Sequence, residues 1–226
     1  MSKEQELINP TSAGLDKAVS YFQQNKKSLS IIGGAILVLI VAFFAYINFY
    51  KAPREQKAAK AIWKAQYYFE IDSFATAVNG DDEYLGFKAI ADNYSGTETG
   101  NLACYYAGMC YLHLADYNNA IKYLEDFSSD DEMLYSLALG ATGDAYMEIG
   151  NVDKAISKYE KAISNSDNNY STPRFLKKAA LVLESQGKFD KAAKNYERIL
   201  NDYEASSEAR DVEKYIERAK NSEVAK

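Results

Sequence analysis

Residues 142–162 read TGDAYMEIGNVDKAISKYEKA, and the order of small, large and turn residues in this stretch returns on both sides of it. A pair of small residues is followed by a large side chain, then by a glycine or alanine, and then by an alanine among helix formers. The repeated alanines, at spacings of 35 and 37 residues, are Ala120, Ala155 and Ala192. A period of this length predicts stacked units of two helices each, and hence an all-α fold.

The residue types at the repeated positions suit two closely packed helices joined by a tight turn. Small pairs let the helices approach each other, and they stand at Ala107–Gly108, Thr142–Gly143 and Ala179–Ala180. The turn falls at a residue for which we expect a positive φ, namely Ala115, Gly150 and Gly187. The second helix of each unit is predicted to begin near Tyr117, Val152 and Phe189.

This pattern resembles the tetratricopeptide repeat, a helix–turn–helix unit of about 34 residues. Two departures are Ala115, where glycine is usual, and the missing proline between units. The resemblance implies a solenoid with three repeats over residues 101–206. Residues 51–100 are predicted to hold a linker helix and a degenerate first repeat, interrupted at 79–83. After the interruption a helical apolar face is predicted to resume at Tyr84, and that helix is predicted to end near residues 93–96. Residues 207–226 are predicted to form a C-terminal capping helix that starts at about Ser206 and has a frayed end. Its predicted apolar stripe is Ala209, Val212, Ile216 and Ala219.

An apolar stretch, Leu29–Tyr50 (LSIIGGAILVLIVAFFAYINFY), precedes the repeats. It carries no charge, and about 20 helical residues span the hydrocarbon core of a bilayer. We therefore expect a single transmembrane helix over 29–50, after an N-terminal tail of residues 1–28 that is either loose or contains a short helix at 16–22. A cleaved signal peptide is the alternative, but no small-x-small cleavage site follows the run. Positions along the predicted span are Leu29, Gly34, Leu39, Phe44 and Tyr50.

Charge and cysteine content limit the classes of function. The chain has 26 Lys and Arg against 32 Asp and Glu, a net charge of −6. This acidic balance argues against nucleic-acid binding, because that binding depends on neutralising phosphates. Cys104 and Cys110 would face different sides of one helix, so we expect two unpaired core residues rather than a disulfide.

No pattern typical of catalysis, of a cofactor or of a metal site occurs in the sequence. His113 is the only histidine, so a metal site with paired imidazoles is not available. The acidic clusters at 81–83 and 130–132 lack the alternating oxygen ligands of a calcium loop. We therefore expect their side chains to be solvated and to lie in loops. Neither a Gly-rich phosphate loop nor a nucleophile elbow is present. We therefore expect a protein that is not an enzyme and has no catalytic, cofactor-binding or metal-binding residues.

The resemblance to tetratricopeptide repeats implies a groove, lined by the first helix of each unit, in which peptides bind. The positions that usually face it are Tyr105, Met109, Leu112 and His113 in the first unit, Gly140, Asp144, Met147 and Glu148 in the second, and Arg174, Lys177, Leu181 and Glu184 in the third. The alternative for apolar members such as Leu112 and Leu181 is packing between units. Lys and Asn do not occupy the positions of the carboxylate-clamp subtype, so chaperone C-termini are not expected ligands.

The whole layout, a single span followed by a repeat domain, resembles the YfgM-like family of ancillary Sec translocon subunits of bacteria. The stretches most similar to that family are residues 84–90 and 101–108. The resemblance implies a single-pass protein of the bacterial inner membrane, with a cytoplasmic N-terminus and a periplasmic repeat domain. It also implies an accessory or chaperone-like scaffold whose partners are translocon subunits, secretory chains or chaperones.

Membrane orientation and the identity of the partners stay open at the level of sequence. Five basic residues follow the span within about 20 positions and three precede it, so the positive-inside rule alone favours a cytoplasmic repeat domain. The alternative function is a structural assembly factor that holds another cell-envelope complex together without binding clients. The sequence does not determine the oligomeric state.

Overall fold

Helices joined by loops make up the part of the chain that the computed structural model describes, which is residues 20–21 and 23–224. Most of the predicted N-terminal tail, including most of the range 16–22, lies outside these residues. The chain divides into two compact units, Met1–Pro53 and Arg54–Lys226. In the described residues there is no strand, only an isolated β-bridge between Gly80 and Leu85. The all-α prediction is confirmed.

The described part of the first unit consists mainly of α2 (Lys26–Ala45) and a π-helical turn, η1 (Tyr46–Lys51). None of their residues is buried, and apolar side chains such as Leu39 are exposed. The polar side chains of Ser30 and Asn48 donate to backbone carbonyls four residues earlier, at 2.8 and 2.9 Å. These bonds satisfy polar groups within an apolar helix. The helix is long and apolar enough to cross a bilayer once.

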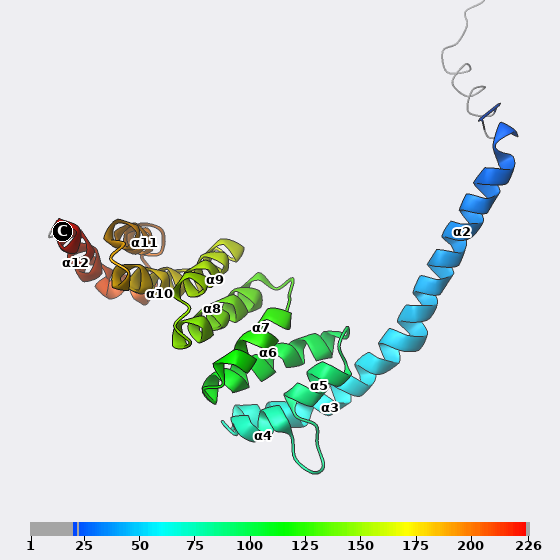
Figure 1. Cartoon of the computed structure of the whole chain (residues 1–226), viewed down its shortest axis with the longest axis horizontal. Helices are drawn as coiled ribbons and strands as arrows, with labels where there is room; N and C mark the ends of the chain where they lie inside the picture. Colours follow the sequence, from blue (N-terminus) through cyan, green and yellow to red (C-terminus); the bar gives the residue numbers. More distant parts are fainter. Residues whose placement is uncertain (1–19, 22, 225–226) are drawn as a thin grey trace, which may run out of the picture. The chain divides into compact units, whose positions relative to one another are not determined.

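The second unit is a succession of helices, shown from cyan to red in Figure 1. They are α3 (Ala52–Glu70), α4 (Phe74–Asn79), α5 (Phe87–Asn93), α6 (Glu98–His113), α7 (Tyr117–Asp126), α8 (Glu132–Glu148), α9 (Val152–Asn165), α10 (Thr172–Ser185), α11 (Phe189–Asp202), the 3₁₀ turn η2 (Glu208–Asp211) and α12 (Val212–Val224). The pairs α6–α7, α8–α9 and α10–α11 correspond to the three predicted repeats, and from α4 onward each α-helix packs on the next along the chain.

Each repeat turns between its helices through a residue with a positive φ. The φ angle is +58° at Ala115, +74° at Gly150 and +68° at Gly187. The amide of the following residue donates to the carbonyl five residues earlier, which ends the first helix. Asp116 and Asn151 then cap the second helix by accepting a bond from the amide three residues later. The second helices begin at the predicted residues, Tyr117, Val152 and Phe189.

The small residues of the repeat lie where its two helices touch. A side chain at Gly108 would collide with Leu124, and one at Gly143 would collide with the ring of Tyr159. The repeated alanines are fully buried, as predicted for close helix packing: Ala120, Ala155 and Ala192. Packing at native density leaves no room for larger side chains at such positions.

The degenerate first unit is divided into three helices, α3, α4 and α5, with a loop over residues 80–86. The carboxylate of Asp81 holds this loop by accepting bonds from the amides of Glu83 and Tyr84, at 2.9 and 2.7 Å. It also accepts a bond of 2.7 Å from the hydroxyl of Tyr68 on α3.

The helix after this loop begins later than the sequence pattern suggested. We expected the helical face to resume at Tyr84, but α5 begins at Phe87. Asp81 fixes Tyr84 within the loop, and Gly86 lies directly against the backbone of residues 78–80. Tyr84 therefore belongs to the loop and not to α5. The end of α5 at Asn93 agrees with the prediction.

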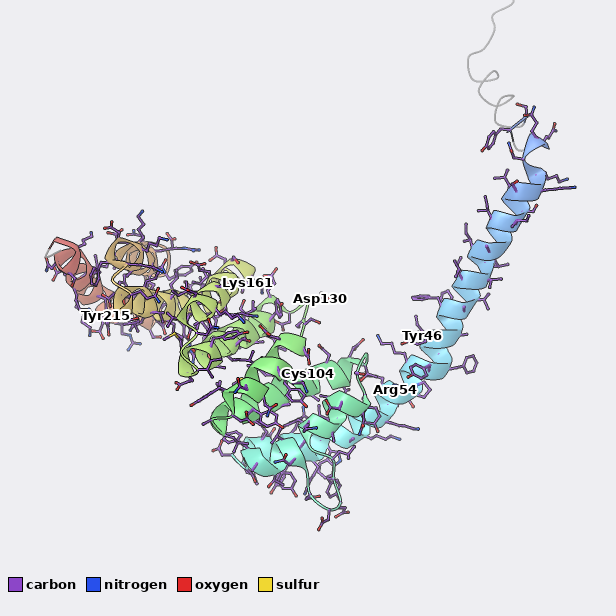
Figure 2. The ribbon with its side chains drawn as sticks, in the orientation of Figure 1. Tyr46, Arg54, Cys104, Asp130, Lys161 and Tyr215 are labelled. Atoms are coloured by element: carbon purple, nitrogen blue, oxygen red, sulfur yellow. The ribbon has the colours of Figure 1, made fainter. Side chains whose placement is uncertain are left out.

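The start of α3 is bound to the neighbouring helices by two charged residues. Arg54, labelled in Figure 2, donates to the carbonyl of Asn93 at 2.7 Å. The carboxylate of Glu55 accepts bonds from the amides of Glu98 and Thr99. These amides open α6, and the partial positive charge of a helix N-terminus favours a carboxylate.

The C-terminal helix covers the last repeat with a narrow apolar stripe. Its buried residues are those predicted from the sequence, Ala209, Val212, Ile216 and Ala219. The segment does not begin as an α-helix after Ser206, because η2 comes first. The hydroxyl oxygen of Ser206 accepts a bond from the amide of Ala209 in this turn, at 3.3 Å.

Candidate peptide-binding groove

Two adjoining clefts lie along the first helices of the three repeats. The first has a volume of about 380 Å³ and is lined by residues of α6, α8 and α10 together with Tyr170 from the loop before α10. The second has a volume of about 470 Å³ and adds residues of α7 and α9. Leu112 and Asp144 line both clefts and so join them. The two clefts together are called the groove.

Nine of the twelve predicted binding positions line the groove. Those in the first cleft are Tyr105, Met109, Leu112, His113, Asp144 and Arg174. Those in the second cleft are Leu112, Asp144, Met147, Glu148 and Leu181. The repeat pattern therefore brings together side chains that are up to 76 residues apart in the sequence, from Tyr105 to Leu181.

Asp144 lies between the clefts, but its charge is already neutralised within the protein. The ammonium group of Lys178 lies 2.6 Å from both carboxylate oxygens. The hydroxyl of Tyr159 donates to the same carboxylate at 2.7 Å. Burial, together with this neighbouring negative charge, raises the pKa of Tyr159, so the phenol remains a proton donor.

Three predicted positions line neither cleft: Gly140, which is buried, and the charged residues Lys177 and Glu184. The ammonium group of Lys177 lies 5.0 Å from the ring centroid of Tyr215, the α12 residue labelled in Figure 2. Glu184 pairs with Arg218 and accepts a bond of 3.2 Å from the hydroxyl of Tyr196. Both side chains are engaged by the C-terminal part of the solenoid, which the repeat pattern alone did not indicate.

The clusters around Asp144 and Glu184 are equivalent. In each, an acid on the first helix of a repeat accepts a bond from a tyrosine on the second helix and pairs with a cation on the next helix. Asp144 and Lys178 are 34 residues apart, and so are Glu184 and Arg218. Since 34 residues is about the length of one repeat, α12 takes the place of the first helix of a fourth unit.

Gly140 and His113 also differ from simple groove-facing residues. Gly140 is buried, and a side chain there would collide with the ring of Phe175, so this position does not face the groove. The ring of His113 stacks on Phe74, with centroids 4.1 Å apart and planes inclined by 5°. His113 thus lines the first cleft while it packs against the degenerate first unit.

Several residues that line the groove were missed by the sequence pattern. They are Leu137, Ala141, Tyr170 and Phe175 in the first cleft and Tyr117, Tyr159, Lys178 and Val182 in the second. The 34-residue spacing from Asp144 could have identified Lys178 as a partner. Tyr170 lies in the loop between α9 and α10, outside the repeat pattern, so no periodicity indicates it.

The chemistry of the described residues is that of packing and polar contact. Within residues 20–21 and 23–224, no group of three or more His, Cys, Asp or Glu is placed to hold a metal ion. Cys104 and Cys110 are free thiols, as predicted. Burial raises their pKa values to about 11 and about 12, so both thiols stay protonated at neutral pH.

Comparisons with known proteins agree with the repeat pattern. Models of the tetratricopeptide repeat match residues 138–169, and also 103–130 and 178–206. No curated protein sequence matches the chain. The fold is similar to a crystal structure of the MamA protein, with a TM-score of 0.54 and 19% identity over 74% of this chain and 92% of that chain. A second crystal structure of MamA gives a TM-score of 0.51 and 20% identity over 71% and 95% of the two chains.

At these identities the similarity to MamA shows the fold alone. The chain is an all-α protein with tetratricopeptide repeats and one N-terminal helix long and apolar enough to span a membrane. The repeats support a protein–protein interaction scaffold as the broad function.

Proposed function

We propose that this protein is a membrane-tethered scaffold that binds segments of other polypeptides in its groove. The observation that carries the proposal is the convergence of nine predicted side chains from three successive repeats on two clefts that share Leu112 and Asp144. The groove combines apolar side chains with a few polar groups, as is usual for sites that recognise other molecules.

The tether in this proposal is the apolar helix over residues 29–50, inserted in the bacterial inner membrane. Its exposed apolar surface and internally bonded polar side chains support insertion. We propose a cytoplasmic N-terminus and a periplasmic repeat domain, following the family resemblance. Protease added to spheroplasts should then digest the repeat domain, and full protection until the membrane is broken would place that domain in the cytoplasm.

The partners that we propose are subunits of the Sec translocon, secretory chains or their chaperones, with this protein acting as an accessory or chaperone-like subunit. This assignment depends on the layout of span and repeats and on the family-like stretches at 84–90 and 101–108. The proposed role is binding without catalysis. Binding of this kind needs no arrangement of side chains for proton transfer. In this proposal His113 is a residue of the groove whose ring stacks on Phe74.

The proposal is tested by photo-crosslinking in membranes. A photoreactive amino acid at Leu112, inside the groove, should capture secretory chains or translocon subunits. The same amino acid at the exposed Lys161 on α9, which is labelled in Figure 2, should not. Capture of other envelope proteins alone, without secretory chains or translocon subunits, would favour the structural assembly factor. Equal capture from both positions would argue against the groove as the binding site.

A further inference from the structure

The charged side chains that line the groove differ in whether they pair with another residue of the protein. Asp144 and Lys178 neutralise each other. Burial, together with the nearby negative charge of Glu148, raises the pKa of the Tyr117 phenol. Arg174, in contrast, has no ion pair or hydrogen bond with any other described residue. It is the cation that the groove leaves available to a ligand.

The surroundings of Arg174 are apolar. The first cleft places it among aromatic and aliphatic side chains, namely Tyr105, Met109, Leu137, Tyr170 and Phe175. Tyr170 is 63% exposed, so its ring offers free surface beside the guanidinium group. A guanidinium group is weakly hydrated and presents a planar set of donors that matches a carboxylate.

The second cleft has the opposite charge character. The acidic residue Glu148 lines this cleft and is exposed. The groove therefore presents a cation in its first cleft and an anion in its second. An acidic side chain is attracted to the first and repelled from the second, which favours one direction of a bound chain.

We propose that the groove binds an apolar polypeptide segment that carries an internal Asp or Glu side chain opposite Arg174. This inference rests on the proposed function and specifies the chemistry of its partner. The two clefts are open and continuous through Leu112 and Asp144, which suits a chain that passes through the groove. Arg174 is the single unpaired cation there, and one guanidinium group matches one side-chain carboxylate.

The test compares three short fluorescent peptides that are identical except for a central Glu, Gln or Lys within an apolar sequence. Their ends are blocked, and their binding to the full chain in lipid nanodiscs is followed by fluorescence anisotropy. The wild-type protein should bind the Glu peptide about threefold to fivefold more tightly than the Gln peptide, as expected for an exposed ion pair. It should bind the Lys peptide most weakly, and added salt should reduce the preference.

The variant Arg174→Glu should reverse the order of the Glu and Lys peptides. Arg210→Glu is the matched control, because it makes the same change of charge at an exposed arginine of η2 that lines neither cleft. It should retain the wild-type order. Circular dichroism of both variants checks that the helices are retained.

Each outcome bears on a different part of the account. Binding of all three peptides with equal affinity, unchanged by Arg174→Glu, would overturn the role of Arg174 and leave the groove in place as a peptide site. No binding of any peptide would overturn the proposed groove function itself. A fourth peptide carries Gln at the centre and a free C-terminal carboxylate. If only this peptide shows the dependence on Arg174, the internal acidic side chain is the wrong ligand.

Discussion

The backbone of Ala115 takes a conformation that glycine takes in the other two repeats. Its φ of +58° lies in the left-handed region, beside +74° at Gly150 and +68° at Gly187. This conformation costs a residue with a side chain about 1–2 kcal/mol relative to the right-handed region. The sequence pattern identified the turn correctly, because the fold places the residue there whether or not it is a glycine.

Replacing Ala115 by glycine should stabilise the protein by about 0.5–1 kcal/mol, since relief of the left-handed conformation outweighs the greater freedom of glycine in the unfolded chain. The reciprocal change, Gly150→Ala, should destabilise by about 1 kcal/mol, because no atom lies near the added methyl group and only the backbone is affected. Thermal unfolding followed by circular dichroism measures both changes. Equal midpoints for both variants and the wild type would contradict this account of the turn.

A cluster of aromatic rings surrounds the ammonium group of Lys64 on α3. Its Nζ lies between 4.9 and 5.4 Å from the ring centroids of four residues, Trp63, Tyr67, Tyr68 and Tyr84. Tyr84 comes from the loop over residues 80–86, so the cluster joins that loop to α3 through cation–π contacts. The carboxylate of Asp81 adds the hydrogen bond from Tyr68.

The attachment of this loop should depend on pH through Asp81. Its pKa is lowered by the hydrogen bond from Tyr68 and by those from the amides of Tyr84 and Glu83. A lowered pKa means that the carboxylate stabilises the attached loop fully above about pH 4, the ordinary value, and that this stabilisation is lost as the pH falls through the lowered value.

The fluorescence of Trp63 reports this change, because it is the only tryptophan and its ring lies 5.7 Å from that of Tyr84. We expect the emission to change on acidification below about pH 4, before the global loss of helix. Asp81→Asn should show the altered emission already at neutral pH. An Asp81→Asn protein with wild-type emission at every pH would rule out this role of the carboxylate.

Among the elements, α3 is joined at its start to α6 by the side chain of Glu55. Glu55 accepts bonds from the two amides that open α6, and its partners are 43 and 44 residues away in the sequence. No periodicity reveals such a contact, because the residues belong to different units and one of those units is degenerate.

Glu55→Ala should release the start of α3 and cost about 1–2 kcal/mol, the usual range for loss of a helix-capping carboxylate. Hydrogen exchange should then accelerate in α3 and at the start of α6, with little change in α8 and α9. Glu70→Ala is the control, because Glu70 is an exposed acid at the other end of the same helix. If both variants accelerate exchange equally, the capping role of Glu55 is wrong.

The repeat elements could be predicted closely, and the irregular ones could not. The second helices begin at Tyr117, Val152 and Phe189 as expected, because the capping and turn chemistry is local to a few residues. The start of α5 at Phe87 was missed, because the bond that the Tyr84 amide donates to the Asp81 carboxylate and the close packing of Gly86 override the helical pattern. Local rules determine the repeats, and tertiary contacts determine the inserted loop.

In the candidate groove, too, local patterns predicted the positions of residues but not the contacts between units. Helix periodicity correctly grouped Leu112, Asp144 and Met147 on one surface. It did not show that Asp144 forms an ion pair with Lys178 or that Glu184 forms one with Arg218, because both are contacts between successive units. The structure was therefore needed to identify which charged side chains of the groove have no partner within the protein.

At the scale of the whole molecule, two features are repeated with the period of the solenoid. One is the helix pair, and the other is the cluster of acid, tyrosine and cation at Asp144 and again at Glu184. Because α12 supplies the cation of the second cluster, it continues the stacking and closes the exposed end of the last repeat. The groove is built from this regular stacking. A bound peptide should therefore change the environment of side chains in more than one repeat.

The methionines offer the most direct measurement of that claim. Met109 lines the first cleft and Met147 the second, whereas Met133 is 43% exposed and lines neither. The remaining methionine, Met1, lies in the tail. Methyl resonances of isotope-labelled methionine can be followed while the acidic apolar peptide is added to the full chain in nanodiscs. The account predicts that the signals of Met109 and Met147 shift together while that of Met133 stays in place. A peptide that binds and shifts Met133, with Met109 and Met147 unchanged, would contradict it.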